Sequence, residues 1–233
     1  RSKSCTIAQL GRDLGTVNDT VAPTGPVVVV GHSMGGMTTI ALAAQRPELF
    51  DQRIVGVGLL ATTAAGLTKT GIGRNLENPV IDGFRHLART APGFVQYTRG
   101  AAKAIIAPIL RAASYGTVVS PKLVEFSDRM LAETSVLTIV NFLRTLELHD
   151  ESAALPVLGR VPALVLCGDA DMIIPFSGSE ELAAALPDVE LKRVRGAGHL
   201  VQLEFPEVVV GALDRLIQRG FAHDAGRRRA AIG

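Results

Sequence analysis

The hydrophobic pattern of the chain alternates between short apolar runs and segments with helical periodicity. Three apolar runs of four to eight residues, at 27–30, 54–61 and 161–167, are typical of strands buried in a parallel sheet, and the first is expected to be buried on both faces. The strand pattern returns at 189–194, where a fourth strand is predicted. Apolar residues at helical spacing predict a first helix at 6–18 and a closing helix at 206–219. Because strands alternate with helices, the pattern predicts an α/β fold with a mostly parallel sheet flanked by helices.

Two helices begin with the spacing of a capping box, in which the side chain of a Ser or Thr accepts from the first turn. The pairs are Thr6 with Gln9, for the helix at 6–18, and Ser177 with Glu180, for a helix at 178–186. The first and last helices also have apolar stripes, which are expected to face inwards. The stripes are Ile7, Leu10, Leu14 and Val17, and Val209, Leu213, Leu216 and Ile217.

A long middle segment, 66–158, lacks strand-like runs and has helical patterns that Gly and Pro interrupt. Helices are predicted at 80–90, 94–113, 120–132 and 135–148. We expect their apolar stripes, such as Val136, Ile139, Val140, Leu143 and Leu146, to pack within a helical lobe. The chain then divides into a core (1–65 and 159–222), an inserted helical cap (66–158) and a basic tail (223–233), whose Arg227, Arg228 and Arg229 are expected to be solvated.

Composition and charge restrict the classes of function. The chain has 233 residues, of which 47% are hydrophobic, and its formal net charge of +2 is too small to favour a nucleic-acid partner. No apolar run reaches the roughly 18 residues that a membrane span needs. Two cysteines, Cys5 and Cys167, make no disulfide framework, which favours a reducing, cytoplasmic compartment, and Cys167 is expected to be a small buried residue. The sequence has no H-E-x-x-H, C-x-x-C or phosphate-loop motif, so neither a metal nor another cofactor is expected.

One short sequence carries the clearest chemical signal. Gly31-His32-Ser33-Met34-Gly35 has the pattern G-x-S-x-G and lies between an apolar run and a helix of small residues. Such a turn holds the serine backbone in a strained conformation and lifts its hydroxyl off the end of the sheet. Side chains two residues either side of Ser33 would collide in the turn, which explains both glycines. Because the following helix directs free N–H groups to the same point, the pattern predicts a nucleophile at Ser33.

A serine hydroxyl needs a base that accepts its proton, and the base needs an anionic partner that fixes its tautomer. Asp171 and His199 both follow the carboxyl end of a predicted strand, as Ser33 does, and ligands of parallel sheets bind at that edge. Asp169 lies in the same loop as Asp171 and is expected to cap that loop. Glu204 is expected to be a charge near a helix N-terminus rather than a catalytic acid.

The chain resembles the α/β-hydrolase fold superfamily from residue 1 to about 220. The resemblance rests on three pieces in the order Ser, Asp, His: Gly31-His32-Ser33-Met34-Gly35-Gly36, then Gly168-x-x-Asp171 with Pro175, then Gly198-His199 with Glu204 and Pro206. It implies that Ser33 is the nucleophile and His199 the general base and then acid. It also implies that Asp171, in preference to Asp169, orients His199, and that the N–H of Met34 supplies half of an oxyanion hole. The segment 66–158 lies where the family inserts its cap.

The other histidines have simpler interpretations. His32 is adjacent to Ser33, so its side chain should point away from the hydroxyl and pack. His86, His149 and His223 lie in the predicted lobe or tail, where structural or solvated roles are expected.

The chain departs from the family before the nucleophile. The family has further strands there, and a loop of His-Gly type that donates the second oxyanion N–H, whereas 26 residues precede Val27 here and none carries that loop. The sequence therefore predicts a fragment, in which the strand at 27–30 is an unpaired apolar edge that aggregates or binds a partner.

The leading functional hypothesis is an acyl-ester hydrolase that acts on a small, largely apolar substrate. A cofactor-free haloperoxidase-like perhydrolase or a carbon–carbon bond hydrolase of the same fold would use the same three residues. A non-catalytic protein that keeps the fold and binds a ligand is the alternative from another class. An epoxide hydrolase or dehalogenase is disfavoured, because those relatives have an aspartate where Ser33 stands. Neither the pattern nor the resemblance determines the oligomeric state.

Overall fold

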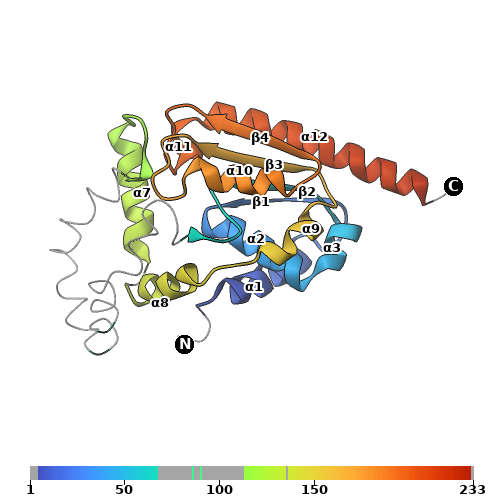
Figure 1. Cartoon of the computed structure of the whole chain (residues 1–233), viewed down its shortest axis with the longest axis horizontal. Coiled ribbons are helices and arrows are strands. Elements are labelled where there is room, and N and C mark those ends of the chain that lie inside the picture. Colours follow the sequence, from blue (N-terminus) through green and yellow to red (C-terminus); the bar gives the residue numbers. More distant parts are fainter. Residues whose placement is uncertain (1–4, 68–85, 87–89, 91–112, 135, 232–233) are drawn as a thin grey trace.

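The predicted strands form a parallel sheet in the computed structural model of the chain, which describes residues 5–67, 86, 90, 113–134 and 136–231. The strands are β1 (Val27–His32), β2 (Ile54–Leu60), β3 (Ala163–Gly168) and β4 (Val189–Val194). They are hydrogen-bonded in the order β1-β2-β3-β4, and every neighbouring pair is parallel. The predicted α/β class is therefore confirmed, and all four carboxyl ends lie at one edge of the sheet (Figure 1).

The helices follow the order of the sequence pattern. They are α1 (Ile7–Val21), α2 (Met34–Gln45), α3 (Pro47–Gln52), α7 (Pro121–Glu133), α8 (Val136–Glu147), the short 3₁₀ helix η4 (Ser152–Ala154), α9 (Leu155–Leu158), α10 (Phe176–Ala184), α11 (Val201–Glu204) and α12 (Pro206–Ala230). The helices predicted at 120–132 and 135–148 are thus confirmed as α7 and α8. Those predicted at 80–90 and 94–113 lie outside the described residues, apart from residues 86, 90 and 113.

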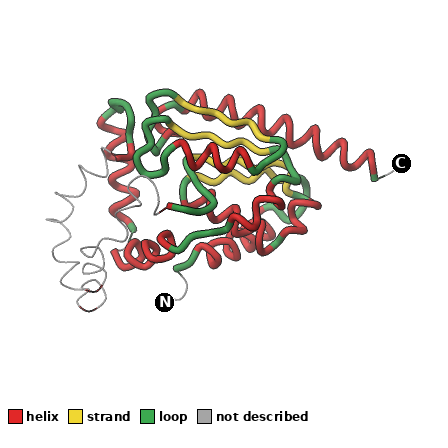
Figure 2. The backbone as a smooth tube through the Cα atoms, in the orientation of Figure 1, coloured by secondary structure: helices red, strands yellow, loops and turns green. Residues whose placement is uncertain are grey.

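Helices cover both faces of the sheet (Figure 2). The side chains of β3 alternate between these faces, as the period of two in a strand requires. Leu164 and Leu166 pack with Leu216 and other residues of α12. Val165 and Ala163 pack on the opposite face with residues of α2, α3, α9 and α10. Because β3 is buried on both sides, its uninterrupted apolar run in the sequence has a direct structural reason.

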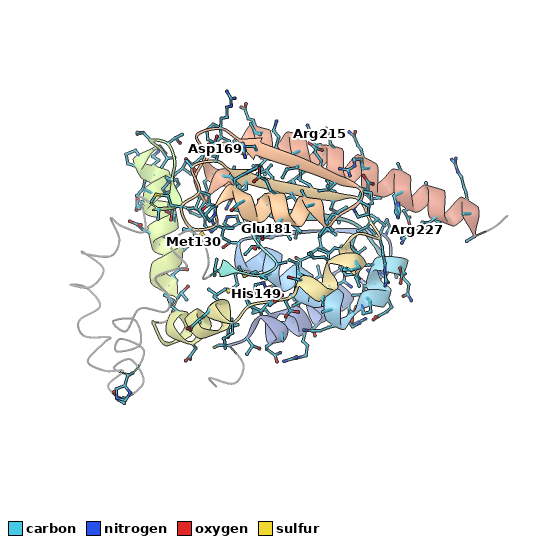
Figure 3. The ribbon with its side chains drawn as sticks, viewed as in Figure 1. Met130, His149, Asp169, Glu181, Arg215 and Arg227 are labelled. Atoms are coloured by element: carbon cyan, nitrogen blue, oxygen red, sulfur yellow. The ribbon has the colours of Figure 1, made fainter. Side chains whose placement is uncertain are left out.

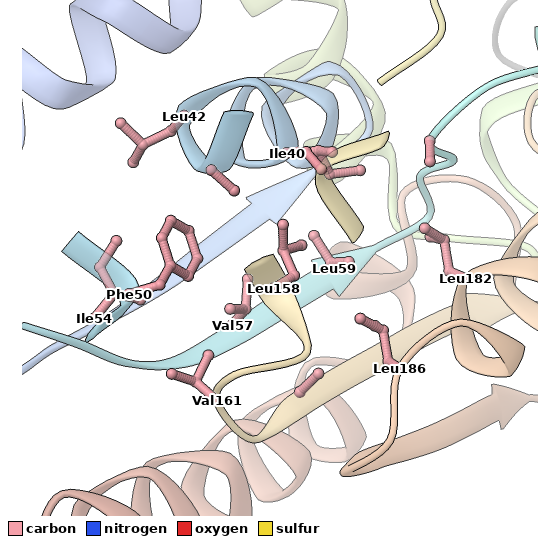
Figure 4. Packing of buried hydrophobic residues seen from close by; sticks show 14 of the residues in the cluster. Ile40, Leu42, Phe50, Ile54, Val57, Leu59, Leu158, Val161, Leu182 and Leu186 are labelled. Carbon is pink, nitrogen blue, oxygen red and sulfur yellow. The ribbon is translucent and has the colours of Figure 1, made fainter. Parts of the chain in front are cut away.

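The larger core lies between the sheet and the layer that contains α2, α3, α9 and α10. Figure 4 shows Ile40 and Leu42 of α2, Phe50 of α3 and Leu158 of α9 around the strand residues Val57 and Leu59. Ala154 and Leu158 are members of this cluster, so the last residues of the segment predicted as a cap pack with the core. Replacement of a large buried side chain such as Leu158 or Ile40 by alanine lowers the free energy of unfolding by about 2–5 kcal/mol.

The position of β1 corrects the expectation that it is buried on both faces and agrees with the expectation that it is an apolar edge strand. Among the described strands β1 pairs only with β2, and Val30 exposes 45% of its surface. Two predicted inward positions are also exposed, Val17 of α1 at 53% and Ile217 of α12 at 41%. All three side chains belong to apolar patterns in the sequence, so such a pattern does not ensure burial at each of its positions.

The closing helix is longer than predicted, because α12 continues from residue 219 to Ala230 and includes most of the segment interpreted as a solvated tail. Arg227 donates from Nη1 to the backbone oxygen of Phe50 at 3.0 Å, and Arg228 donates from Nε to Asp224 at 2.7 Å. Figure 3 shows Arg227 near the far end of α12, beyond Arg215. Arg227 therefore links this end of the helix to α3, whereas Arg228 and Arg229 are exposed, as expected.

The two predicted capping boxes have different outcomes. The Thr6 hydroxyl accepts from the N–H of Gln9 at 3.0 Å, so the first cap is confirmed. The second is wrong, because α10 begins at Phe176 and its N-cap residue is Pro175. A fixed proline φ favours the start of a helix two residues before the position that the capping spacing suggested.

No helix in the described part of the chain is long and apolar enough to cross a membrane. Both cysteines are free, and Cys167 is fully buried in β3 as expected.

Candidate functional site

Ser33 lies in the sharp turn between β1 and α2. Its φ of 53° is in the left-handed region, which L residues adopt only under strain. Two hydrogen bonds hold it there: the Ser33 N–H donates to the backbone oxygen of Leu60 at 2.9 Å, and the Thr62 hydroxyl donates to the backbone oxygen of Ser33 at 2.7 Å. Neighbouring strand β2 therefore fixes the backbone that presents the Ser33 hydroxyl.

The glycines of the turn have different reasons to be glycine. A Cβ on Gly31 would overlap the backbone of Gly35, and one on Gly36 would overlap the Thr62 side chain. A Cβ on Gly35 would meet no atom within 4 Å. The expectation of a collision on both sides of Ser33 is therefore confirmed for Gly31 and wrong for Gly35. Gly36, which the pattern does not include, is sterically required.

This difference predicts opposite results for two substitutions in one pentapeptide. We expect Gly31→Ala to lower the free energy of unfolding by about 3 kcal/mol, because backbone atoms must move to admit the methyl group. Gly35→Ala should leave stability unchanged or raise it by up to about 1 kcal/mol, because alanine favours helix and has space here. Urea unfolding of both variants measures this, and equal destabilisation would contradict the assignment.

The three side chains predicted to act together form a continuous hydrogen-bonded chain. The distance from Ser33 Oγ to His199 Nε2 is 2.9 Å, and that from His199 Nδ1 to Asp171 Oδ2 is 2.8 Å. Because a carboxylate only accepts, Nδ1 of the neutral ring is the donor, which leaves the lone pair of Nε2 for the serine proton. The side chains of His199 and Asp171 are only 8% and 0% exposed.

The carboxylate of Asp171 is held from both sides. Its Oδ1 accepts from the N–H groups of Ile173 and Ile174, at 2.8 and 2.9 Å, while Oδ2 faces His199. The thiol of Cys167 also donates to Oδ2 at 3.7 Å. Burial, and then the charge of Asp171, raises the pKa of Cys167 to about 12, so the thiol stays protonated. Only one orientation of the carboxylate satisfies all of these donors.

The two competing acids have other partners. Asp169 Oδ1 accepts from the N–H of Gly196 at 2.7 Å, which confirms that it caps its loop. Figure 3 shows Asp169 at the same end of the sheet as α11. Glu204 is more than the helix charge that was expected, because its carboxylate accepts from backbone N–H groups of two different segments.

His32 packs beneath the histidine of the site, as its predicted packing role requires. Its Nε2 donates to the backbone oxygen of His199 at 2.8 Å, and the two ring centroids are 4.9 Å apart. Burial, together with repulsion by the His199 ring in its charged form, lowers the pKa of His32 to about 4. The neutral ring of His32 therefore supports the backbone of His199 over the usual range of pH.

The low pKa of His32 predicts a loss of stability in acid. Between pH 6.5 and about 4 the unfolded chain binds a proton that the native ring does not, so the free energy of unfolding falls as pH decreases through this range, by about 3 kcal/mol. Burial also lowers the pKa of His149, which adds to the same slope. His32→Gln keeps an N–H donor without the titration, so its stability should fall less steeply. Urea titrations at several pH values compare the two proteins, and identical slopes would contradict the assignment.

The surroundings of the turn are apolar on one side. Met34, the first residue of α2, packs with Ile173 and Leu146 against a buried cluster; its buried members are Ile7, Met37, Ala41, Leu67 and Ile174. His149 is buried, whereas His86 is exposed and His223 half-buried, and none of the three is part of the hydrogen-bonded chain. Within the residues that the structure describes, no cluster of His, Cys, Asp or Glu could hold a metal ion.

Comparison with known proteins agrees with this geometry. The sequence profile of the Alpha/beta hydrolase family matches residues 5–212. The chain belongs to the alpha/beta hydrolase family. The resemblance on which the sequence interpretation relied is thereby confirmed.

This alpha/beta hydrolase is similar to several known proteins. YugF of Bacillus subtilis, described as an uncharacterized hydrolase, is 26% identical over 185 residues, which are 78% of this chain and 62% of YugF. An esterase from Thermogutta terrifontis superposes with a TM-score of 0.70 at 25% identity, over 92% of this chain and 73% of the esterase. A bromoperoxidase from Bacillus anthracis, with a TM-score of 0.68 at 18% identity over 90% of this chain and 75% of its own, shows a shared fold. The chain thus spans less than two thirds of the length of YugF.

Proposed function

We propose that this alpha/beta hydrolase cleaves carboxylic esters through an acyl-enzyme on Ser33. His199 acts as general base and then as general acid, and Asp171 orients its ring. The observation that carries the proposal is the unbroken chain of hydrogen bonds, 2.9 Å from Ser33 to His199 and 2.8 Å from His199 to Asp171. General-base activation of a serine requires this arrangement.

The reaction has two halves. Ser33 Oγ attacks the ester carbonyl carbon while its proton passes to His199 Nε2, and the tetrahedral intermediate collapses when Nε2 returns that proton to the leaving alcohol. Water then attacks the acyl-enzyme, its proton passes to Nε2, and the Ser33 oxygen leaves with that proton as the carboxylic acid departs. Asp171 stays ionised throughout and stabilises the imidazolium that forms twice.

The negative oxygen of both intermediates needs hydrogen-bond donors. Met34 is the first residue of α2, and the first N–H groups of a helix have no partner within it. Its N–H is adjacent to the nucleophile and is the donor that we assign to the oxyanion. The helix dipole of α2 contributes in the same direction.

The substrate that fits this site is a small, largely apolar ester. Met34 follows Ser33 in the chain, Ile173 is two residues from Asp171, and both pack, as Leu146 does, against a buried apolar cluster. An apolar acyl group placed there would be removed from water, which contributes about 25 cal/mol per Å². Polar recognition would then be confined to the ester group itself.

A fluorophosphonate probe and short p-nitrophenyl esters test the proposal. We expect the probe to label one serine, which peptide mass spectrometry identifies as Ser33, and the esters to release p-nitrophenol. Prior labelling should stop that release. If the folded protein neither reacts with the probe nor releases p-nitrophenol, the proposal is wrong, and a ligand-binding protein of the same fold becomes the better interpretation.

A further inference from the structure

Glu204, at the end of α11, joins two segments that are far apart in the sequence. Its Oε1 accepts from the N–H of Gly198 at 2.6 Å. Its Oε2 accepts from the N–H groups of Gly116 and Thr117, at 2.9 and 2.8 Å, and from the Thr117 hydroxyl at 2.8 Å. A single carboxylate therefore takes four hydrogen bonds, one from the loop that precedes His199 and three from the segment before α7.

The two backbones also touch directly. The N–H of Leu200 donates to the backbone oxygen of Ser114 at 2.9 Å. A Cβ on Gly116 would overlap the backbone at Gly196, and a Cβ on Gly198 would overlap the backbone at Gly116. Glycine at both positions thus allows the two backbones to approach more closely than any side chain at Gly116 or Gly198 would permit.

His199 lies in the middle of this contact between residues 114–117 and the loop 196–200. The residue before it is bound through Glu204 to 116–117, and the residue after it is bound to Ser114. The segment 114–117 is in turn bound to α7, because the Tyr115 hydroxyl donates to Ser127 at 2.9 Å and to the backbone oxygen of Leu123 at 3.3 Å. Displacement of α7 would therefore pull on the backbone that carries the base. Figure 1 shows α7 and α11 at the same end of the sheet.

We propose that Glu204 is a positioning residue that locks the loop of His199 to residues 114–117, so that the base and α7 move as one body. The predicted effect of Glu204 on turnover rests on the proposed ester hydrolysis. The hydrogen-bonded lock between the two segments does not depend on that function. When Glu204 loses its charge or its second acceptor oxygen, the loop and the segment before α7 should loosen together. A base displaced by about 1 Å costs up to about 100-fold in turnover.

The test compares Glu204→Gln with Glu207→Gln, a matched loss of charge at an exposed residue three positions on. Hydrogen–deuterium exchange, read on peptides that cover 114–117 and 196–200, measures the lock without any substrate. We expect exchange to rise at least about tenfold in both peptides of Glu204→Gln and in neither peptide of Glu207→Gln. A rise in only one peptide, or in neither, overturns the proposal.

Kinetics then separates positioning from a general loss of structure. With active sites counted by the fluorophosphonate, kcat per labelled site should fall about ten- to a hundredfold in Glu204→Gln while KM changes less than about threefold, because Glu204 is not placed to contact substrate. An unchanged kcat per site overturns the positioning role. If the wild-type protein shows no hydrolysis and no labelling, the proposed function fails, whereas the exchange result still decides the lock.

Thr117→Val provides a second variant, because it removes one donor and leaves both backbone N–H groups. We expect it to raise exchange in the same two peptides to a smaller extent, and to add little when combined with Glu204→Gln, since both changes act on one lock. Independent, fully additive effects of the two substitutions would overturn the proposal. If Glu204→Gln does not fold, Thr117→Val, a change at an exposed residue, is measured by itself: exchange that rises in both peptides supports the lock, and exchange that is unchanged in either peptide overturns it.

Discussion

Replacement of Ser33 by alanine should reduce the rate of ester hydrolysis by about 10⁴- to 10⁶-fold and leave the fold intact. The nucleophile forms the covalent intermediate in the proposed mechanism, so what remains is the slow attack of water on a bound ester. Alanine also fits the backbone, because the strain at φ 53° is the same for both residues. Stopped assays with a p-nitrophenyl ester measure the loss.

Ser177→Ala is the matched control, since that serine is exposed in the first turn of α10 and has the same chemistry without the neighbours. Its activity should equal that of the wild type. Substantial hydrolysis by Ser33→Ala, after contaminating esterases have been removed, would exclude the acyl-enzyme on Ser33.

Asp171→Asn should reduce kcat by about 10⁴-fold, although it changes one atom. The oxygen of the amide is required by the N–H groups of Ile173 and Ile174, so its NH₂ group must face His199. An NH₂ group cannot accept from Nδ1, so the ring takes the other tautomer and Nε2 carries the proton. His199 then cannot accept the proton of Ser33. Nitrogen NMR of the histidine ring shows the tautomer directly, and a wild-type tautomer combined with the rate loss would refute this explanation.

Asp169→Asn is the control, because Asp169 lies in the same loop and caps Gly196 instead. We expect a kcat within about threefold of the wild-type value, since an asparagine oxygen can still accept from that N–H. A loss as large as that of Asp171→Asn would mean that the two acids had been assigned incorrectly.

The parts of the site that sequence alone predicts are those that local patterns encode. Ser33 lies in a strand–turn–helix whose glycines and apolar run are contiguous in the chain. Asp171 and His199 each follow the end of a strand, and a parallel sheet brings such ends to one edge whatever the intervening length. For the same reason the order of elements was predictable, while the ends of α10 and α12 were not.

The features that sequence missed depend on neighbours that are distant in the chain. Glu204 contacts Gly116 and Thr117 across 88 and 87 residues, and no local signal encodes that pairing. The long α12 is stabilised at its basic end by Phe50, a contact across 177 residues.

The reactivity of the buried Cys167 thiol would measure how often the structure around Asp171 opens. The sulfur touches the carboxylate of Asp171 and has no exposed surface, so an alkylating reagent can reach it only after this end of the sheet has opened. Cys5, which is half-buried near the start of α1, provides an internal reference for reagent reactivity. The ratio of alkylation at these two sulfurs would report how often the surroundings of Asp171 open in the folded protein, without a substrate or a spectroscopic probe.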